Sequence, residues 1–270
     1  MSSGGIPGYD PRSFPPVAVT VDVVLFAIRG DALQVLLIER GGDPFRGWRA
    51  LPGGFVQPGD GDLDRAAERE LAEETSVDPE AAYLEQLGTY GAADRDPRMR
   101  VISVAYWAAC AELPRPRGGS DAARAELVPV SRIEDGDVEL AFDHGQIAGD
   151  ALDRLRAKLE YTAVAARFCG PAFTISDLRR VYEAVWNAEM DAGNFQRKVR
   201  HNEPFRRFEE EEAPMLSMAS PAASLVGRRG VRVPSGRHGG RPASLWTAED
   251  PSSLLNSPIT RPGPASAAFR

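Results

Sequence analysis

Three glutamates stand close together in RELAEETSV, residues 69 to 77 of the chain. Glu70, Glu73 and Glu74 are spaced at i, i+3 and i+4, which places them on one side of one helical turn. Like charges at that spacing repel by roughly 0.2–0.5 kcal/mol per pair in an isolated helix. Carboxylate oxygens are the ligands that Mg²⁺ prefers, and this ion usually bridges to phosphates. The spacing therefore indicates either a magnesium site for diphosphate chemistry or a solvated acidic helix face.

The neighbouring residues suit the first interpretation. Arg69 is placed to support a carboxylate or to contact a phosphate. The loop WRALPGGFV contains Gly53 and Gly54, which allow the backbone to bend tightly. A helix is predicted from about residue 63 to residue 75, with Asp62 as its N-cap. Its buried stripe would consist of Leu63, Ala67 and Leu71.

The stretch LPGGFVQPGDGDLDRAAERELAEETSV resembles the Nudix box, whose family pattern is G-x5-E-x7-R-E-U-x-E-E-x-G-U with U apolar. Gly54 matches the first glycine. The second half of the pattern is matched by Arg69, Glu70, Leu71, Glu73, Glu74 and Val77. Asp60 stands where the family has Glu, one extra residue lies between Asp60 and Arg69, and Ser76 replaces the closing glycine.

This resemblance implies an α/β fold, the Nudix α/β/α sandwich with a mixed sheet. It also implies a catalytic role for four residues, Arg69, Glu70, Glu73 and Glu74. The three glutamates would hold Mg²⁺, with Mn²⁺ as the alternative ion.

The strands that would position this helix are visible as apolar, β-branched runs. VAVTVDVVLFAI and LQVLLIE are separated by turn residues and predict a hairpin. LEQLGTYGA and RVISVAYWAACAEL predict two more strands, and LVPVSRI a short one. Arg95 and Arg98, in the loop before the second of these, are candidates for contact with a ligand phosphate, the alternative being a solvated loop. Residues 15–145 are therefore predicted to form one α/β domain.

The second half of the chain has a helical texture. Residues 146–168 predict a connecting helix, and FTISDLRRVYEAVW a second helix that begins near Thr174 or Ser176. NFQRKVRH predicts a third helix, capped by Asp191 or Asn194. Strand candidates EPFRRF and RPASLWT follow, so residues 169–248 would form a winged helix-turn-helix domain.

Basic residues gather in this domain although the whole chain carries a net charge of −7. Residues 194–207 contain five basic side chains and one acidic side chain, and residues 227–241 contain five arginines and no acid. Such asymmetry is what contact with DNA phosphates requires. The alternative is a small helical cap or dimerisation domain with a solvated basic face. The acidic run of residues 209–212, within an irregular insertion at 209–235, is expected to point away from DNA.

Several stretches of the sequence show a second resemblance. LEYTAVAARFCGPAFTISDLRRVYEAVWNAEMDAGNFQRKV, together with GGRPASLW and RDPRMRVISVAY, resembles the Nudix-related transcriptional regulators of NAD metabolism. Membership of that family would imply a Nudix domain that binds ADP-ribose or a related nucleotide, with Gly54 among the ligand-binding residues. It would also imply a winged helix that binds operator double-stranded DNA as a homodimer. The implied DNA contacts are Asn194, Arg197 and Lys198, with Arg237 and Arg241 from the wing.

Two functions remain open from the sequence. The chain is expected to be a nucleotide-sensing transcriptional regulator, or a Mg²⁺-dependent Nudix hydrolase that cleaves ADP-ribose or a nucleoside-diphosphate sugar, and one protein can do both. The intact glutamates favour hydrolytic activity, whereas the altered first half of the Nudix box disfavours it.

Composition sets the remaining expectations. Hydrophobic residues make up 43% of the 270 residues, enough for a packed core. The two cysteines, Cys110 and Cys169, are expected to be reduced thiols. The longest apolar run is too short to span a membrane, which predicts a soluble cytoplasmic protein. Residues 1–14 are predicted to be a flexible tail and residues 249–270 a disordered one. The three histidines are interpreted as surface or junction residues.

Overall fold

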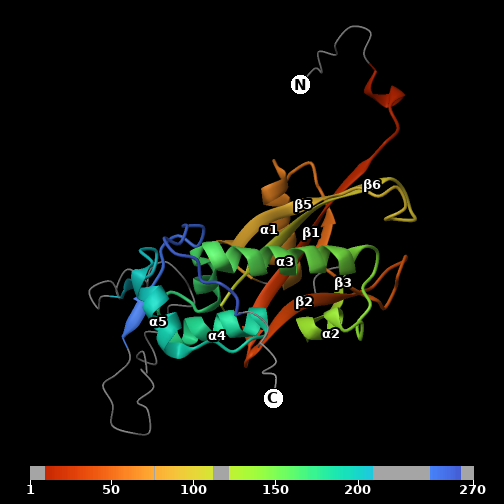
Figure 1. Cartoon of the computed structure of the whole chain (residues 1–270). Helices are drawn as coiled ribbons and strands as arrows, with labels where there is room; N and C mark the ends of the chain where they lie inside the picture. Colours follow the sequence, from red (N-terminus) through yellow and green to blue (C-terminus); the bar gives the residue numbers. More distant parts are fainter. Residues whose placement is uncertain (1–9, 76, 112–121, 209–243, 263–270) are drawn as a thin grey trace, which may run out of the picture.

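A mixed β-sheet forms the centre of the first half of the chain (Figure 1). The computed structural model describes residues 10–75, 77–111, 122–208 and 244–262. The strands of the sheet are β1 (Ala18–Arg29), β2 (Ala32–Arg40), β3 (Arg49–Ala50), β4 (Gly53–Phe55), β5 (Tyr83–Tyr90), β6 (Val101–Ala109) and β7 (Ala122–Pro129). Along the order β3-β2-β1-β6-β5, β1 and β6 run parallel and the other neighbours are antiparallel, while β4 pairs with β1 and β7 with β2. The predicted hairpin and mixed sheet are confirmed.

Helices cover both faces of this sheet (Figure 1). Alternate residues of β1 point to opposite faces, as the period of a strand requires. Val21, Val23 and Leu25 pack with α1 (Leu63–Thr75), whereas Val24 and Phe26 belong to the core formed with α3 (His144–Tyr161). The predicted α/β/α sandwich is thereby confirmed, and α1 has the predicted bounds.

The second half contains two helices and a small sheet. The helices are α4 (Ile175–Trp186) and α5 (Ala192–His201), and the sheet orders β8 (Phe173–Thr174), β10 (Leu245–Thr247) and β9 (Arg206–Arg207). This is the predicted arrangement of a winged helix. Its core is continuous with the layer beneath α3, since the buried residues of α4 and α5 belong to the same apolar cluster. The predicted domain boundaries stay predictions.

Two elements differ from their predicted form. The strand predicted for LVPVSRI ends at Pro129, and α2 (Val130–Glu134) follows it. The predicted helix over residues 146–168 is interrupted at Thr162, whose backbone is extended. The Thr162 hydroxyl donates to the carbonyl of Lys158 at 2.8 Å and accepts from the amide of Val164 at 3.4 Å, which competes with the helical pattern. A 3-10 helix then covers Ala163–Phe168.

The predicted disorder at the C-terminal end is wrong for residues 249–262. Ile259 is completely buried and Leu255 is buried, so this segment takes part in the core. A Pro-rich composition did not prevent the segment from packing, because Leu255 and Ile259 join the apolar cluster that contains the buried residues of α3, α4 and α5. Short 3-10 helices also occur at Pro11–Ser13 and Pro79–Ala81. Both cysteines are free thiols. Among the described residues, no helix combines the length and apolarity that a bilayer crossing requires.

Candidate functional site

The glutamate-bearing helix α1 begins where its sequence predicts. The side chain of Asp62 accepts a hydrogen bond from the amide of Arg65 at 2.8 Å, which is the N-cap interaction. Leu71 is fully buried against the sheet. The flanking Glu70 and Glu74 are also buried, whereas the side chain of Glu73 is 56% exposed. The helix therefore presents two sheltered carboxylates and one exposed carboxylate.

The glycine loop lies directly against these carboxylates. The amide of Gly53 donates to Glu74 Oε2 at 3.0 Å. A Cβ atom at Gly54 would meet the carboxylate of Glu70, only 2.9 Å from its Cδ atom. A larger residue fits this contact only if the Glu70 carboxylate moves, so glycine allows the loop to approach Glu70 closely.

Arg69 joins the loop to the helix. Its guanidinium donates to both carboxylate oxygens of Asp60, from Nε at 2.7 Å and from Nη2 at 3.0 Å. The Nη1 atom donates to Glu70 at 2.7 Å and to Glu73 at 3.3 Å. Hydrogen bonding to Arg69 lowers the pKa of Asp60 to about 2. Asp60, where the family has Glu, thus remains paired with Arg69.

The extra residue of the box is accommodated in the turn before the helix. Gly61 adopts φ +79°, a conformation that glycine takes readily. Asp60 is held in place from the other side, because the amide of Gln57 donates to its Oδ2 at 2.6 Å. The insertion is absorbed without loss of the Asp60–Arg69 pair. Ser76, at the closing position of the box, lies outside the described residues.

The carboxylates of α1 suit a hard cation by their chemistry. Burial is the largest cause of the raised pKa of Glu70, and the charge of Glu73 adds to it. A cation close to both would stabilise their ionised forms. In the part of the chain that the structure describes, no three acidic, His or Cys side chains are already arranged as a metal cage. Arg69 occupies the space between Glu70 and Glu73, so it would have to move to admit an ion.

The two loop arginines proposed for ligand contact have different surroundings. Arg95 is buried, with 4% of its side chain exposed, and donates to both oxygens of Asp143 at 2.9 and 2.7 Å. Its guanidinium is therefore committed to an internal ion pair rather than presented to a ligand. Arg98 is 42% exposed, pairs with Asp96 at 2.6 Å, and lies 5.5 Å from the ring of Phe55.

Behind the loop lies a buried polar cluster that sequence analysis did not identify. Asp22 is buried in β1, accepts a hydrogen bond from Ser103, and lies 3.6 Å from both Arg95 and His144. His144 accepts from the amide of Leu51 at 2.9 Å, and burial lowers its pKa. His144 was interpreted as a surface or junction residue; it is not at the surface but buried, as the first residue of α3. A charged residue within the apolar run VTVDVV was the signal that could have revealed Asp22.

The helix pair of the winged helix is built on strong caps and aromatic contacts. Thr174 and Asp177 form a reciprocal capping box at the start of α4, which resolves the predicted choice between Thr174 and Ser176. Asp191 caps α5 by accepting from the amide of Asn194 at 2.7 Å. The ring of Tyr182 contacts that of Phe195 edge-on, with centroids 5.2 Å apart. These contacts fix α5 against α4.

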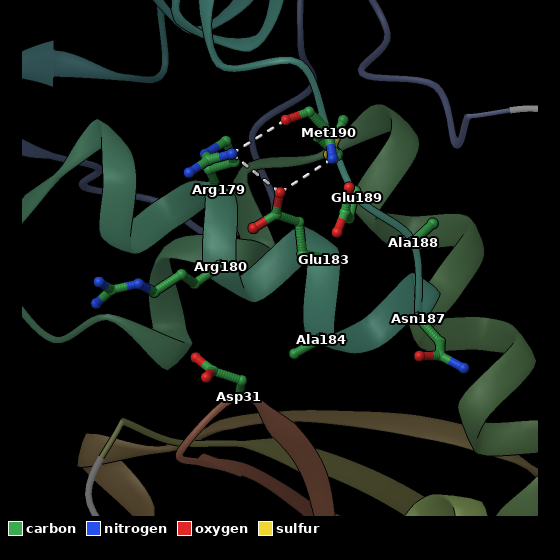
Figure 2. A pocket seen from close by; sticks show the side chains of 9 residues that line it. All are labelled: Asp31, Arg179, Arg180, Glu183, Ala184, Asn187, Ala188, Glu189 and Met190. Carbon is green, nitrogen blue, oxygen red and sulfur yellow. Dashed lines mark hydrogen bonds and ion pairs between the residues drawn. The ribbon is translucent and has the colours of Figure 1, made fainter.

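The turn between these helices is fixed by an ion pair (Figure 2). Arg179 contacts Glu183 at 3.1 Å and donates to the carbonyl of Met190 at 3.0 Å, and the amide of Met190 donates to Glu183 at 2.9 Å. A cavity of about 470 Å³ lies between this turn and Asp31 in the β1–β2 hairpin. None of the predicted site residues lines it, so this cavity is distinct from the glutamate site.

The predicted DNA contacts share the outer side of α5. Phe195 and Val199 are buried, while Asn194 and Arg197 are exposed and Lys198 is partly exposed. This leaves a basic face pointing away from the core. The wing candidates Arg237 and Arg241 lie outside the described residues, as does the insertion at 209–235. The glutamate helix packs on the opposite face of the sheet from α3 and α4, so the two candidate sites are separate.

Two family models match the chain. The NUDIX domain matches residues 16–148, and the NrtR DNA-binding winged helix domain matches residues 165–214. The chain is 33% identical over 192 residues to the ADPR responsive transcriptional repressor NtrR of Acinetobacter baylyi, which covers 71% of this chain and 75% of that protein.

Solved structures agree with these matches. The structure of Shewanella oneidensis NrtR complexed with a 27mer DNA is similar with a TM-score of 0.65 and 27% identity, over 90% of this chain and 99% of that one. The NUDIX domain of the same protein, complexed with ADP ribose, is similar with a TM-score of 0.50 and 36% identity, over 55% of this chain and 94% of that one.

Proposed function

The chain belongs to the NrtR family of transcriptional regulators, which join a NUDIX domain to a DNA-binding winged helix, and we propose that it is a repressor responsive to ADP-ribose. In this proposal the nucleotide binds at the loop and helix around Arg69, and its binding changes the affinity of α5 for operator DNA. In this proposal the protein is cytoplasmic, and a homodimer would let two copies of α5 contact an operator.

One observation carries the proposal: α3 connects the loop near the nucleotide site to the winged helix. At its start, Asp143 is the N-cap residue and is held by Arg95 at 2.7 Å. At its middle, Arg156 donates to the carbonyl of Val185 in α4 at 3.3 Å, and Trp186 Nε1 donates to the carbonyl of Arg156 at 3.3 Å. A displacement of the loop would therefore be transmitted through α3 to α4.

The sheet side of α3 keeps this connection rigid. Glu85 in β5 pairs with Arg154 at 2.9 Å and with Lys158 at 2.6 Å, and it accepts a hydrogen bond from Tyr83. Two cations of α3 thus share one carboxylate of the sheet. A rigid helix moves as a unit, which is the property that a coupling element needs.

The nucleotide site in this proposal combines a diphosphate region and a stacking region. Arg69 and the amides of the glycine loop would meet the diphosphate. Phe55, 44% exposed, lies beside Arg98 and offers a face for a base. Arg98 is the loop arginine that we assign to the ligand, whereas Arg95 acts from behind by holding Asp143.

The DNA site in this proposal is the exposed face of α5. Asn194 and Arg197 have side chains that can read base edges with two hydrogen bonds each. Lys198 would contact a phosphate. Arg237 and Arg241 of the wing remain candidates for further backbone contacts.

Hydrolysis is the second candidate function, and the intact Asp60–Arg69 pair favours it. Glu70, Glu73 and Glu74 would hold Mg²⁺, or Mn²⁺ in its place. Such an ion polarises a diphosphate and lowers the pKa of a bound water. Within the protein, Arg69 would leave Glu70 and Glu73 and remain on Asp60, from where it can orient the substrate. A regulator with this activity would slowly destroy its own ligand.

Calorimetry with ADP-ribose, combined with DNA binding, tests the proposed function. We expect ADP-ribose to bind and to change DNA affinity by about 5- to 150-fold, which corresponds to roughly 1–3 kcal/mol of coupling. Arg98→Ala should weaken nucleotide binding, whereas Arg132→Ala, at an exposed arginine of α2, should not. DNA affinity that is unchanged at saturating ADP-ribose would contradict the proposal.

A further inference from the structure

The segment of residues 249–262, named here the C-terminal brace, lies between the end of α3 and the end of α5 (Figure 1). Its hydrogen bonds with the end of α3 and with the 3-10 helix that follows are made by the backbone. The amide of Ala163 donates to the carbonyl of Ser253 at 3.0 Å, and the amide of Leu255 donates to the carbonyl of Tyr161 at 2.8 Å. The amide of Ile259 donates to the carbonyl of Glu160 at 3.0 Å, and the Ile259 side chain is fully buried. The brace is thus fixed to the connecting helix.

A buried asparagine attaches the other side of the brace to α5. Asn202, 1% exposed, donates from Nδ2 to the carbonyl of Ser257 at 3.0 Å, and its Oδ1 accepts from the amide of Ser257 at 2.9 Å. The amide of Glu203 also donates to Asn256 Oδ1 at 2.9 Å. Nδ2 donates in addition to the carbonyl of Lys198 at 3.0 Å. The last turn of α5 is therefore tied to the brace by paired, directional hydrogen bonds.

The ammonium group of Lys198 is held by the same segment. Its Nζ atom donates to the carbonyl of Pro258 at 3.1 Å and to Thr260 Oγ1 at 3.4 Å. An ammonium group has three donors and no acceptor. Two of the three are directed to the brace, which leaves one for a ligand. The long side chain is thereby held in one orientation on the exposed side of α5.

We propose that the C-terminal brace is a positioning element of the DNA-binding site, in which Thr260 and the carbonyl of Pro258 hold the Lys198 ammonium ready for a DNA phosphate. This inference rests on the proposed function, because it assigns α5 to DNA. Lys198 contacts the phosphate, and Thr260 acts through Lys198. Ordering a flexible side chain before binding removes part of the entropic cost of association. The brace also ties α5 to α3, so it would carry the movement of α3 to the DNA-binding residues.

The test uses the full-length chain and duplex DNA selected by the wild-type protein from a random-sequence library. Thr260→Val removes the hydroxyl at nearly constant volume, and we expect the affinity to fall by about two- to fivefold. Thr260→Ser restores a hydroxyl and should restore the affinity. Ser252→Ala is the matched control, because it removes a brace hydroxyl that bonds only within the brace, to Asp250 at 2.6 Å.

A double-mutant cycle with Lys198→Met separates positioning from general stability. Lys198→Met should reduce the slope of log affinity against log salt by about 0.9, the value for one phosphate contact. In that background Thr260→Val should have no further effect, since its influence passes through Lys198. An equal loss from Thr260→Val in both backgrounds, or no loss in either, would overturn the inference. Wild-type protein that selects no DNA would overturn the proposed function and the inference together.

Discussion

Glycine-to-alanine changes along the site loop should have graded effects on stability that follow from what each new Cβ would meet. At Gly59 the space is open, with no atom within 4 Å. At Gly54 the new atom would meet the end of the Glu70 side chain. At Gly53 it would meet the backbone carbonyl of Val21, and it would lie 2.9 Å from the Cα atom of Asp22. A new Cβ atom would therefore meet nothing at Gly59, a movable side chain at Gly54 and fixed backbone at Gly53.

The expected changes in the free energy of unfolding differ in sign and size among the three variants. Gly59→Ala reduces the freedom of the unfolded chain and should stabilise the fold by about 0.4–1 kcal/mol. Gly54→Ala displaces the Glu70 carboxylate from Arg69, to which it is bonded at 2.7 Å, and should destabilise by about 1–2 kcal/mol. Gly53→Ala requires a backbone shift in β1 and should cost about 3 kcal/mol, at the upper end of overpacking effects.

Urea denaturation of the three variants measures this order directly. Calorimetry adds a functional reading, because Gly54→Ala disturbs Glu70 and should weaken ADP-ribose binding about tenfold, or 1.4 kcal/mol. Gly59→Ala serves as the control and should keep the wild-type affinity. If Gly54→Ala were as stable and bound as well as Gly59→Ala, the close contact between the loop and Glu70 would not matter in solution.

Three further predictions concern charged residues. The pKa of Asp60 is lowered to about 2, so the stability from its pairing is fully present above its ordinary value of 3.8 and is lost as pH falls through about 2. The difference in urea midpoint between wild type and Asp60→Asn should therefore be constant near neutral pH, shrink below pH 3.8 and vanish only below about pH 2. A difference that stays at its neutral-pH size down to pH 2 would be inconsistent with this pairing. Changing both Arg197 and Lys198 to Ala should abolish DNA binding in a gel-shift assay, and binding that survives would mean that α5 is not the recognition helix. Glu73→Gln should remove any Mg²⁺-dependent release of AMP from ADP-ribose yet leave the melting temperature unchanged, since this side chain is 56% exposed; turnover that continued would exclude Glu73 from the mechanism.

Local patterns in the sequence were sufficient for much of the fold. The helix over residues 63–75 was predictable because its cap, its apolar stripe and its length are encoded within that segment. The break at Thr162 could not be predicted, because an apolar repeat continues across it. The hydrogen bonds that compete with the helix become visible only in the folded structure. The same reason applies to α2, where a strand-like sequence turns into a helix after Pro129.

The candidate site divides in the same way. Arg69 and the glutamates could be identified from spacing, since one helical turn brings them together. The pairing of Asp60 with Arg69 could not be identified from the sequence, because the inserted residue changes the spacing between them. Only the folded structure shows that the turn at Gly61 accommodates the insertion. Arg95 and Arg98 look alike in the sequence, but burial makes one of them internal and leaves the other at the surface.

By itself, the sequence determined the two candidate sites of this protein. One is a helix of carboxylates beside a glycine loop, and the other is a basic helix beside a small sheet. Both could be identified because each depends on residues close together along the chain. Only the tertiary structure decided how the two are connected. The ion pair of Arg95 with Asp143 joins residues 48 positions apart, and the bonds of Lys198 to the C-terminal brace span about 60. Contacts of that separation are set by the packing of the whole chain, which no local pattern records.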